Sequence, residues 1–135
     1  MDFLVNLDVD DLERAVVFYR EAFGFTLGRR FGSAVVELLG GPAPLYLLAK
    51  AAGTEAFDGD TRHRDYRRHW TPLHLDFVVD DIEAAVTRAT AAGAVLERPI
   101  ATQAWGRLAL LHDPFGHGFC LVQFLGEGYD AIADR

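Results

Sequence analysis

Hydrophobic and polar residues alternate in two short segments of the chain, residues 3–9 and 73–79, except at the apolar Leu4 and Val78. In both segments the odd-numbered residues are apolar. The even-numbered positions carry the polar side chains Asn6, Asp8, His74 and Asp76. A period of two is typical of a strand with one buried face, so each segment is predicted to be a strand whose polar face lies away from its packing partner.

A helix is predicted directly after each of these strands. Apolar residues then recur at helical spacing and form one stripe, made of Leu12, Ala15, Val16, Tyr19 and Phe23 in the first copy and of Ile82, Ala85, Val86 and Ala89 in the second. Acidic pairs with capping-box spacing precede the stripes, namely Asp10 with Glu13 and Asp80 with Glu83. Each helix is expected to end at a glycine, Gly24 or Gly93.

The two copies form an internal repeat. Residues 9–16 match residues 79–86 at an offset of 70 positions. Three more strands are predicted after each helix, at Phe25–Phe31, Ser33–Leu39 and Leu45–Lys50 and at Val95–Ile100, Leu108–His112 and Phe119–Phe124. The sequence therefore predicts an α+β fold of two tandem βαβββ modules within one domain. Their expected bounds are about 1–50 and 72–125, with a connector at 51–71 and a C-terminal tail at 126–135.

Composition narrows the classes of partner. The 135 residues carry a net charge of −7, which disfavours nucleic acid as a partner, and they contain no apolar run long enough to span a membrane. Cys120 is the only cysteine, so an internal disulfide and a multi-cysteine zinc site are excluded. The chain starts without the pattern of a signal peptide, and a cytoplasmic protein is expected.

The connector contains one basic and aromatic run, Arg62 to Trp70. Such a run is usually a solvated loop, but it could also attract an anionic ligand or pair with an acidic dimer partner. The connector as a whole exceeds usual loop lengths, which suggests a lid, an interface arm or a short helix. His112 and His117 flank the turn at 113–116 and are expected at its surface.

Several motifs together resemble the vicinal oxygen chelate superfamily, which includes glyoxalase I, bleomycin-resistance proteins and extradiol dioxygenases. The segments that carry the resemblance are Leu7–Glu13, Phe18-Tyr19, Phe23–Phe25, His74–Asp81 and Asp113–Val122. The resemblance implies curved mixed sheets around a cleft, a small-molecule ligand and commonly a homodimer. The same fold hosts both enzymes and binding proteins, so it does not settle the function.

The resemblance also places four metal-ligand positions, at Leu4, about Tyr46, His74 and Cys120. Leucine cannot bind a metal, and a neutral tyrosine is a poor ligand for a divalent cation. Only His74 and Cys120 remain as candidate donors, and a stable catalytic site normally has three. No cofactor is therefore predicted, although a divalent metal remains possible at these two residues.

The leading functional hypothesis is a small-molecule-binding protein of the bleomycin-resistance type. Its expected ligand-binding residues are Asn6, Asp8, Tyr46, His74, Asp76, Trp105, Arg107 and Cys120. The alternative is a glyoxalase-like lyase or isomerase, or a dioxygenase-like enzyme, with an unusual metal site or metal-free acid–base catalysis by His74. Plainer roles stay open too: a hydrogen-bonded histidine at 74, a tryptophan covering a loop at 105, and an inert apolar thiol at 120.

Overall fold

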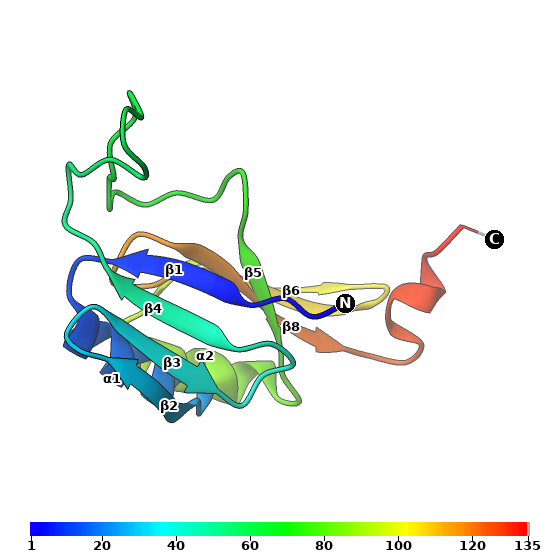
Figure 1. Cartoon of the computed structure of the whole chain (residues 1–135). Coiled ribbons are helices and arrows are strands. Elements are labelled where there is room, and N and C mark those ends of the chain that lie inside the picture. Colours follow the sequence, from blue (N-terminus) through cyan, green and yellow to red (C-terminus); the bar gives the residue numbers. More distant parts are fainter. Residues whose placement is uncertain (135) are drawn as a thin grey trace. The chain divides into compact units, whose positions relative to one another are not determined.

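The chain folds as two successive βαβββ units, and the computed structural model describes residues 1–134 (Figure 1). The first unit contains β1 (Val5–Val9), α1 (Leu12–Phe23), β2 (Thr26–Phe31), β3 (Val35–Leu39) and β4 (Leu45–Ala49). The second contains β5 (Leu75–Val78), α2 (Ile82–Ala92), β6 (Val95–Gln103), β7 (Gly106–His112) and β8 (Gly118–Phe124), followed by the short helix η1 (Gly128–Ala131). The predicted α+β class and the tandem βαβββ modules are confirmed.

Each unit forms its own four-stranded mixed sheet, with strand orders β1-β4-β3-β2 and β5-β8-β7-β6. The first strand of each unit runs parallel to the last, and the remaining pairs are antiparallel. Two parallel strands need a long crossover connection between them. In each unit the helix and the two middle strands supply this connection between the first strand and the last. The observed strands are generally offset by one or two residues at their ends from the predicted ones, and β6 extends furthest, to Gln103.

The helix starts differ by one residue from the sequence prediction. The N-caps are Asp11 and Asp81, whose side chains accept hydrogen bonds from the amides of Arg14 and Ala84, both at 3.1 Å. The predicted caps, Asp10 and Asp80, were wrong: two acidic residues are adjacent in each copy, and it is the second one, with an extended backbone, whose side chain caps the helix. Both predicted glycine stops are confirmed in the left-handed conformation.

The assignment of Asp11 as the N-cap of α1 can be tested directly by substitution. Asp11→Ala is expected to lower the free energy of unfolding by about 1 kcal/mol, because an orphan amide of the first helical turn loses its acceptor. Asp10→Ala is the matched control and is expected to change it by less than ~0.5 kcal/mol. Urea denaturation of the two variants checks the assignment, and equal losses for both would refute it.

The core of each unit lies between its helix and one face of its sheet. In the first unit Val36, Leu38 and Leu47 are fully buried, as are Ala109, Leu111 and Leu121 in the second. Two contacts from β7 and β8 mark the helix side of the second sheet: Arg107 pairs with Glu83 of α2, and Gln123 accepts from the amide of Ile82. Alternation along β8 then puts Cys120 on the opposite face. We call that opposite surface the helix-free face.

The connector contains no helix among its described residues, so of the three predicted alternatives the short helix is excluded. Its first part belongs to the first unit, which ends at Arg67, and the second unit begins at Arg68. The Arg64 guanidinium ties this part to β1 through an ion pair with Asp8, at 2.7 Å. The Tyr66 hydroxyl donates to the carbonyl of Lys50, at 2.6 Å. The first part of the connector is therefore a loop fastened to its own unit.

The basic run of the connector is neutralised locally. Four arginines each lie within ion-pair distance of a carboxylate of their own unit: Arg62 with Asp60, Arg64 with Asp8, Arg67 with Asp65, and Arg68 with Glu97. These pairings leave little net positive charge to attract an anionic ligand.

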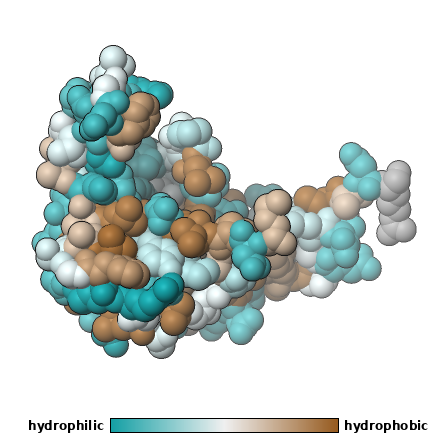
Figure 2. Space-filling view, in the orientation of Figure 1, coloured by the Kyte–Doolittle hydropathy of each residue, from teal (hydrophilic) through white to brown (hydrophobic). Residues whose placement is uncertain are grey.

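On the visible surface, hydrophobic and hydrophilic side chains are intermixed (Figure 2). None of the helices at residues 1–134 is long and apolar enough to cross a membrane.

Candidate functional site

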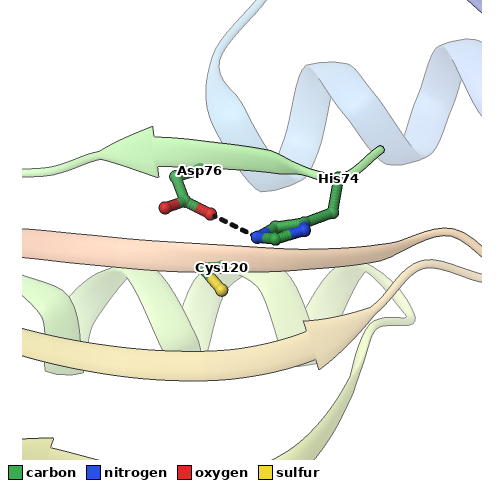
Figure 3. Close-up of side chains that lie close together, drawn as sticks. All are labelled: His74, Asp76 and Cys120. Atoms are coloured by element: carbon green, nitrogen blue, oxygen red, sulfur yellow. Dashed lines mark ion pairs between the residues drawn. The ribbon is translucent and has the colours of Figure 1, made fainter. Parts of the chain in front are cut away.

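Three side chains with metal-binding and acid–base chemistry meet on the helix-free face of the second unit. His74 and Asp76 project from the start of β5 and Cys120 from the adjacent β8 (Figure 3). The His74 Nε2 atom lies 3.3 Å from Asp76 Oδ1, and one donor atom from each of the three residues lies within 4.8 Å of the others. The parallel register makes this possible, because Asp76 is the direct neighbour of Cys120 across the two strands.

Exposure differs within this group. The side chains of His74 and Asp76 are 43% and 40% exposed, whereas Cys120 is buried, with only 6% of its surface exposed. Burial, together with the charge of Asp76 and a hydrogen bond to it, raises the pKa of the Cys120 thiol to about 12. The thiol is therefore protonated at neutral pH and is not an activated nucleophile.

Alkylation of Cys120 tests this environment. With its thiol pKa near 12 instead of the usual ~8.5, iodoacetamide is expected to label the folded protein more than ~100-fold more slowly at pH 7 than the unfolded chain. The rate should keep rising with pH well beyond pH 9, since the thiolate fraction continues to grow there. Because Cys120 is the only cysteine, mass spectrometry reports on this site alone. Equal rates for folded and unfolded protein would contradict the protonated, buried thiol.

Trp70 lies beside this group and is held by the carboxylate of Glu97, whose side chain is 14% exposed. Its ring meets that of His74 edge to face, with the centroids 5.4 Å apart, and its Nε1 atom donates to Glu97 Oε2 at 3.0 Å. The same carboxylate accepts from Arg68 and contacts His112 Nδ1 at 2.7 Å. Burial would raise the pKa of Glu97, but the hydrogen bonds from Arg68, His112 and Trp70 outweigh it and keep the pKa below its usual value. Glu97 is therefore ionised and fixes the indole.

A glycine makes room for the tryptophan. A Cβ atom on Gly118 would lie 2.4 Å from the Trp70 ring and 2.9 Å from the carbonyl oxygen of His69. The amide of Gly118 donates to that carbonyl and the amide of His69 donates to Gly116, each at 2.8 Å. Residues 69–70 thus run along the start of β8, and the absence of a side chain at 118 lets the indole approach the strand.

The first unit carries a different polar cluster on its own helix-free face. Arg29 Nε and Nη2 lie 2.7 and 3.1 Å from the two carboxylate oxygens of Glu37. The Tyr46 hydroxyl accepts from Arg29 at 2.7 Å and donates to Glu37 at 3.2 Å. The hydrogen bonds from Arg29 lower the pKa of the buried Glu37 to about 2. Asn6 is exposed and pairs in register with Tyr46, as Asp76 does with Cys120.

The other predicted ligand-binding residues lie elsewhere within their units. Asp8 is paired with Arg64. Arg107 lies on the helix side of the second sheet, where it pairs with Glu83 at 2.9 Å. Trp105 packs against Phe124 and Tyr129, with centroids 6.3 and 5.1 Å away. The structure therefore brings His74, Asp76 and Cys120 together but not Arg107 or Trp105.

The donor set fits a divalent metal better than the sequence suggested. A tetrahedral ion with bonds of 2.0 to 2.3 Å requires donor atoms roughly 3.3–3.8 Å apart. The His74–Asp76 separation of 3.3 Å already matches, and the thiol sulfur needs a shift of about 1 Å at most from the 4.8 Å limit. The sequence predicts two donors, His74 and Cys120, and the structure adds Asp76 as a third.

Sequence reasoning missed Trp70, Glu97 and His112 as parts of this face. His112 was expected at the surface of its turn, but it is only one-quarter exposed and pairs with Glu97. The alternation of β7 offered a signal, since His112 has the same parity as Leu108 and Leu110. No local pattern indicates that Glu97 accepts hydrogen bonds from Arg68 and Trp70. These residues are 29 and 27 positions earlier in the chain, and only the tertiary fold brings them to β6.

The fold and its repeat define a member of the vicinal oxygen chelate superfamily. A family model described as Glyoxalase-like domain matches residues 4–122, and the chain belongs to that family. Across the matched region lie both helices, both sheets and the His74, Asp76 and Cys120 group.

The chain is also similar to three particular proteins, one in sequence and two in fold. The chain is 34% identical to the anthracycline biosynthesis protein DauV of Streptomyces sp. (strain C5) over 96% of its own length and 43% of that protein. It thus spans less than half of this curated relative. The crystal structure of TioX from Micromonospora sp. ML1 is 24% identical, with a TM-score of 0.69 over 93% of this chain and 99% of that one. A glyoxalase/bleomycin resistance protein/dioxygenase family enzyme from Burkholderia phytofirmans PsJN is 22% identical, with a TM-score of 0.69 over 90% of this chain and 97% of that one.

Proposed function

We propose that the protein binds a drug-sized natural product on the helix-free face of the second unit. The observation that carries the proposal is the grouping of an imidazole, a carboxylate and a fixed indole within one small surface, at His74, Asp76 and Trp70. Ligand sites in proteins combine apolar and aromatic surface with a few placed polar groups. The relationship to a protein named for anthracycline biosynthesis supports a natural product as the ligand class.

The chemistry of the face favours a planar aromatic ligand with hydroxyl or carbonyl groups. The Trp70 indole is prevented from rotating by its bond to Glu97, so little side-chain entropy would be lost when a ring packs against it. The exposed His74 and Asp76 side chains can donate to or accept from the ligand's oxygens. A ligand that contacts both features would gain apolar burial and orientation together.

Calorimetric titration with an anthracycline, doxorubicin, tests the proposal. Binding is expected in the wild-type protein, and His74→Ala or Trp70→Phe should weaken it at least tenfold, equivalent to about 1.4 kcal/mol. His63→Ala is the matched control, because His63 is an exposed connector histidine of the first unit that contacts the carbonyl of Gly53. Equal affinity in all variants, or no binding at concentrations up to about 1 mM, where the binding free energy is only about −4 kcal/mol, would overturn the proposal.

The second candidate is catalysis by a glyoxalase-like lyase or isomerase, or by a dioxygenase-like enzyme, and the His74–Asp76 contact favours it. With a proton on Nε2 facing Asp76, the Nδ1 atom of His74 is left as an acceptor that can take a proton from a substrate. A divalent metal at the group would polarise neighbouring substrate oxygens. A glyoxalase assay on the methylglyoxal–glutathione adduct tests this candidate. Turnover that His74→Ala abolishes would support it, and turnover unchanged by that substitution would remove His74 from the reaction.

We also propose that the protein acts as a homodimer, as the resemblance to its superfamily implies. Sedimentation equilibrium gives the mass in solution directly. A mass near twice the 14.9 kDa of the chain is expected, and a single species at the monomer mass would contradict the proposal.

A further inference from the structure

The Glu97 carboxylate takes up hydrogen-bond donors on the helix-free face of the second unit. It accepts from the Trp70 indole at 3.0 Å and from Arg68, and its Oε1 atom lies 2.7 Å from Nδ1 of a histidine, His112. Parity along β7 puts His112 on the face opposite Arg107. An ionised carboxylate only accepts, so the proton of a neutral His112 ring lies on Nδ1 and the Nε2 atom is left as an acceptor. The ring is one-quarter exposed, and it therefore offers an acceptor to a ligand.

The Asp76 carboxylate takes up the neighbouring donors on the same face. The Cys120 thiol donates a hydrogen bond to it, and the His74 Nε2 atom lies 3.3 Å from its Oδ1 atom. A proton on Nε2 is attracted to this carboxylate, and that tautomer leaves the His74 Nδ1 atom as an acceptor. Asp76 is 40% exposed, so its oxygens keep capacity to accept from a ligand. The outward polar atoms beside Trp70 are therefore acceptors at both carboxylates.

We propose that this face selects aromatic ligands that donate hydrogen bonds through hydroxyl or protonated amine groups, and that it rejects ligands that present a carboxylate. The inference rests on the proposed function and narrows its ligand class. Its basis is the direction of the hydrogen bonds, since the atoms that His74, Asp76 and His112 turn outward accept and only a donor can pair with them. A ligand acceptor placed against these atoms would lose its bonds to water without replacing them, which is unfavourable.

Charge on the face acts in the same direction. Arg68 balances Glu97 in an ion pair, whereas the neighbours of Asp76 are an imidazole and a thiol that burial keeps protonated. An ammonium group of a ligand would gain a charge-assisted hydrogen bond from Asp76, and a carboxylate would be repelled by it. The guanidinium of Arg68 is half exposed and would favour the opposite order if its pairing with Glu97 were loose. The test therefore includes a ligand with a carboxylate.

Titration of the full chain with a matched set of anthraquinones tests the inference. The compounds share one ring system and carry a methyl, hydroxymethyl, aminomethyl or carboxylate group at the same ring position. Quenching of Trp70 fluorescence, recorded in a Trp105→Phe background, reports binding at this face. Relative to the methyl compound, the hydroxymethyl compound is expected to bind at least about threefold and the aminomethyl compound at least about tenfold more tightly, because hydrogen bonds to charged groups are the stronger ones. The carboxylate compound is expected to bind more weakly than the methyl compound.

Two acid-to-amide substitutions separate the acceptor that faces the ligand from charge in general. Asp76→Asn should reduce the preference for the aminomethyl over the carboxylate compound at least about tenfold, because an amide donates as well as accepts. Glu83→Gln is the matched control: it removes a carboxylate from the helix side of the same unit, where Glu83 pairs with Arg107, and should keep the wild-type order. Circular dichroism checks the fold of both variants.

The outcomes distinguish this inference from the proposed function. Equal affinity for the four compounds, tightest binding of the carboxylate compound, or a preference unchanged in Asp76→Asn would overturn the inference and leave the proposed function standing. If none of the compounds quenches Trp70 fluorescence, the proposed binding face is contradicted and the inference falls with it.

Discussion

Gly118→Ala is expected to lower the free energy of unfolding by about 2–3 kcal/mol, which is the cost of forcing extra volume into a packed site. The new Cβ atom would lie 2.4 and 2.5 Å from two atoms of the Trp70 ring and 2.9 Å from the His69 carbonyl. Either the indole moves off β8 or the paired backbone opens. Movement of the indole would break its hydrogen bond to Glu97, so the helix-free face would lose its aromatic side chain as well as stability.

Two measurements check this expectation. Thermal denaturation should show a melting temperature lower by roughly 5–10 °C for a loss of this size in a chain of 135 residues. The fluorescence of Trp70, isolated in a Trp105→Phe background, should shift because the indole changes its surroundings. Gly41→Ala is the matched control, since a Cβ there meets its nearest neighbours at an ordinary 3.6 Å. A Gly118→Ala protein with wild-type stability and fluorescence would show that Trp70 does not lie on β8.

Asp113→Ala is expected to cost about 2–4 kcal/mol of stability, because it leaves buried amides without their acceptor. The Asp113 side chain is fully buried, and its Oδ1 atom accepts from the amides of Phe115 and His117 at 2.8 and 2.9 Å. These bonds shape the turn that leads into β8, and the carbonyl of Gly116 in that turn receives the amide of His69. Loss of the turn would therefore loosen both β8 and the segment that carries Trp70.

Asp113→Asn separates the hydrogen bonds from the charge. Both amides donate to the same oxygen, so the asparagine side chain can retain both acceptor contacts. Its loss of stability in urea denaturation is expected to be less than half that of Asp113→Ala. Equal losses for the two variants would show that the negative charge, and not the two amide bonds, is what the turn requires.

The fold could be predicted because its signals are local. The alternation at residues 73–79 and the apolar stripe that begins at Ile82 each specify an element within a few residues, and both elements are present. The adjacent acidic residues at 10–11 and 80–81 show where this kind of inference loses precision. Either residue satisfies a capping pattern, and only the backbone conformation at Asp11 and Asp81 decides between them.

The candidate site could be predicted only in part. Strand parity correctly put His74 and Asp76 on one face about 7 Å apart along the strand, but the contact of 3.3 Å depends on how the side chains lean. The approach of Cys120 depends on a parallel register between strands more than 40 residues apart, which no local pattern specifies. For the same reason Glu97 could not be recognised as the group that fixes Trp70.

The proposed binding function depends on one claim, that the ligand binds on the helix-free face of the second unit around His74. Amide chemical-shift mapping of the isotopically labelled protein during titration with doxorubicin tests this claim most directly. The largest shifts are expected at residues 69–76 and 118–122, on the segment of Trp70 and on β5 and β8. Shifts confined to α2 and the Arg107–Glu83 side of the sheet, or to the first unit, would contradict it.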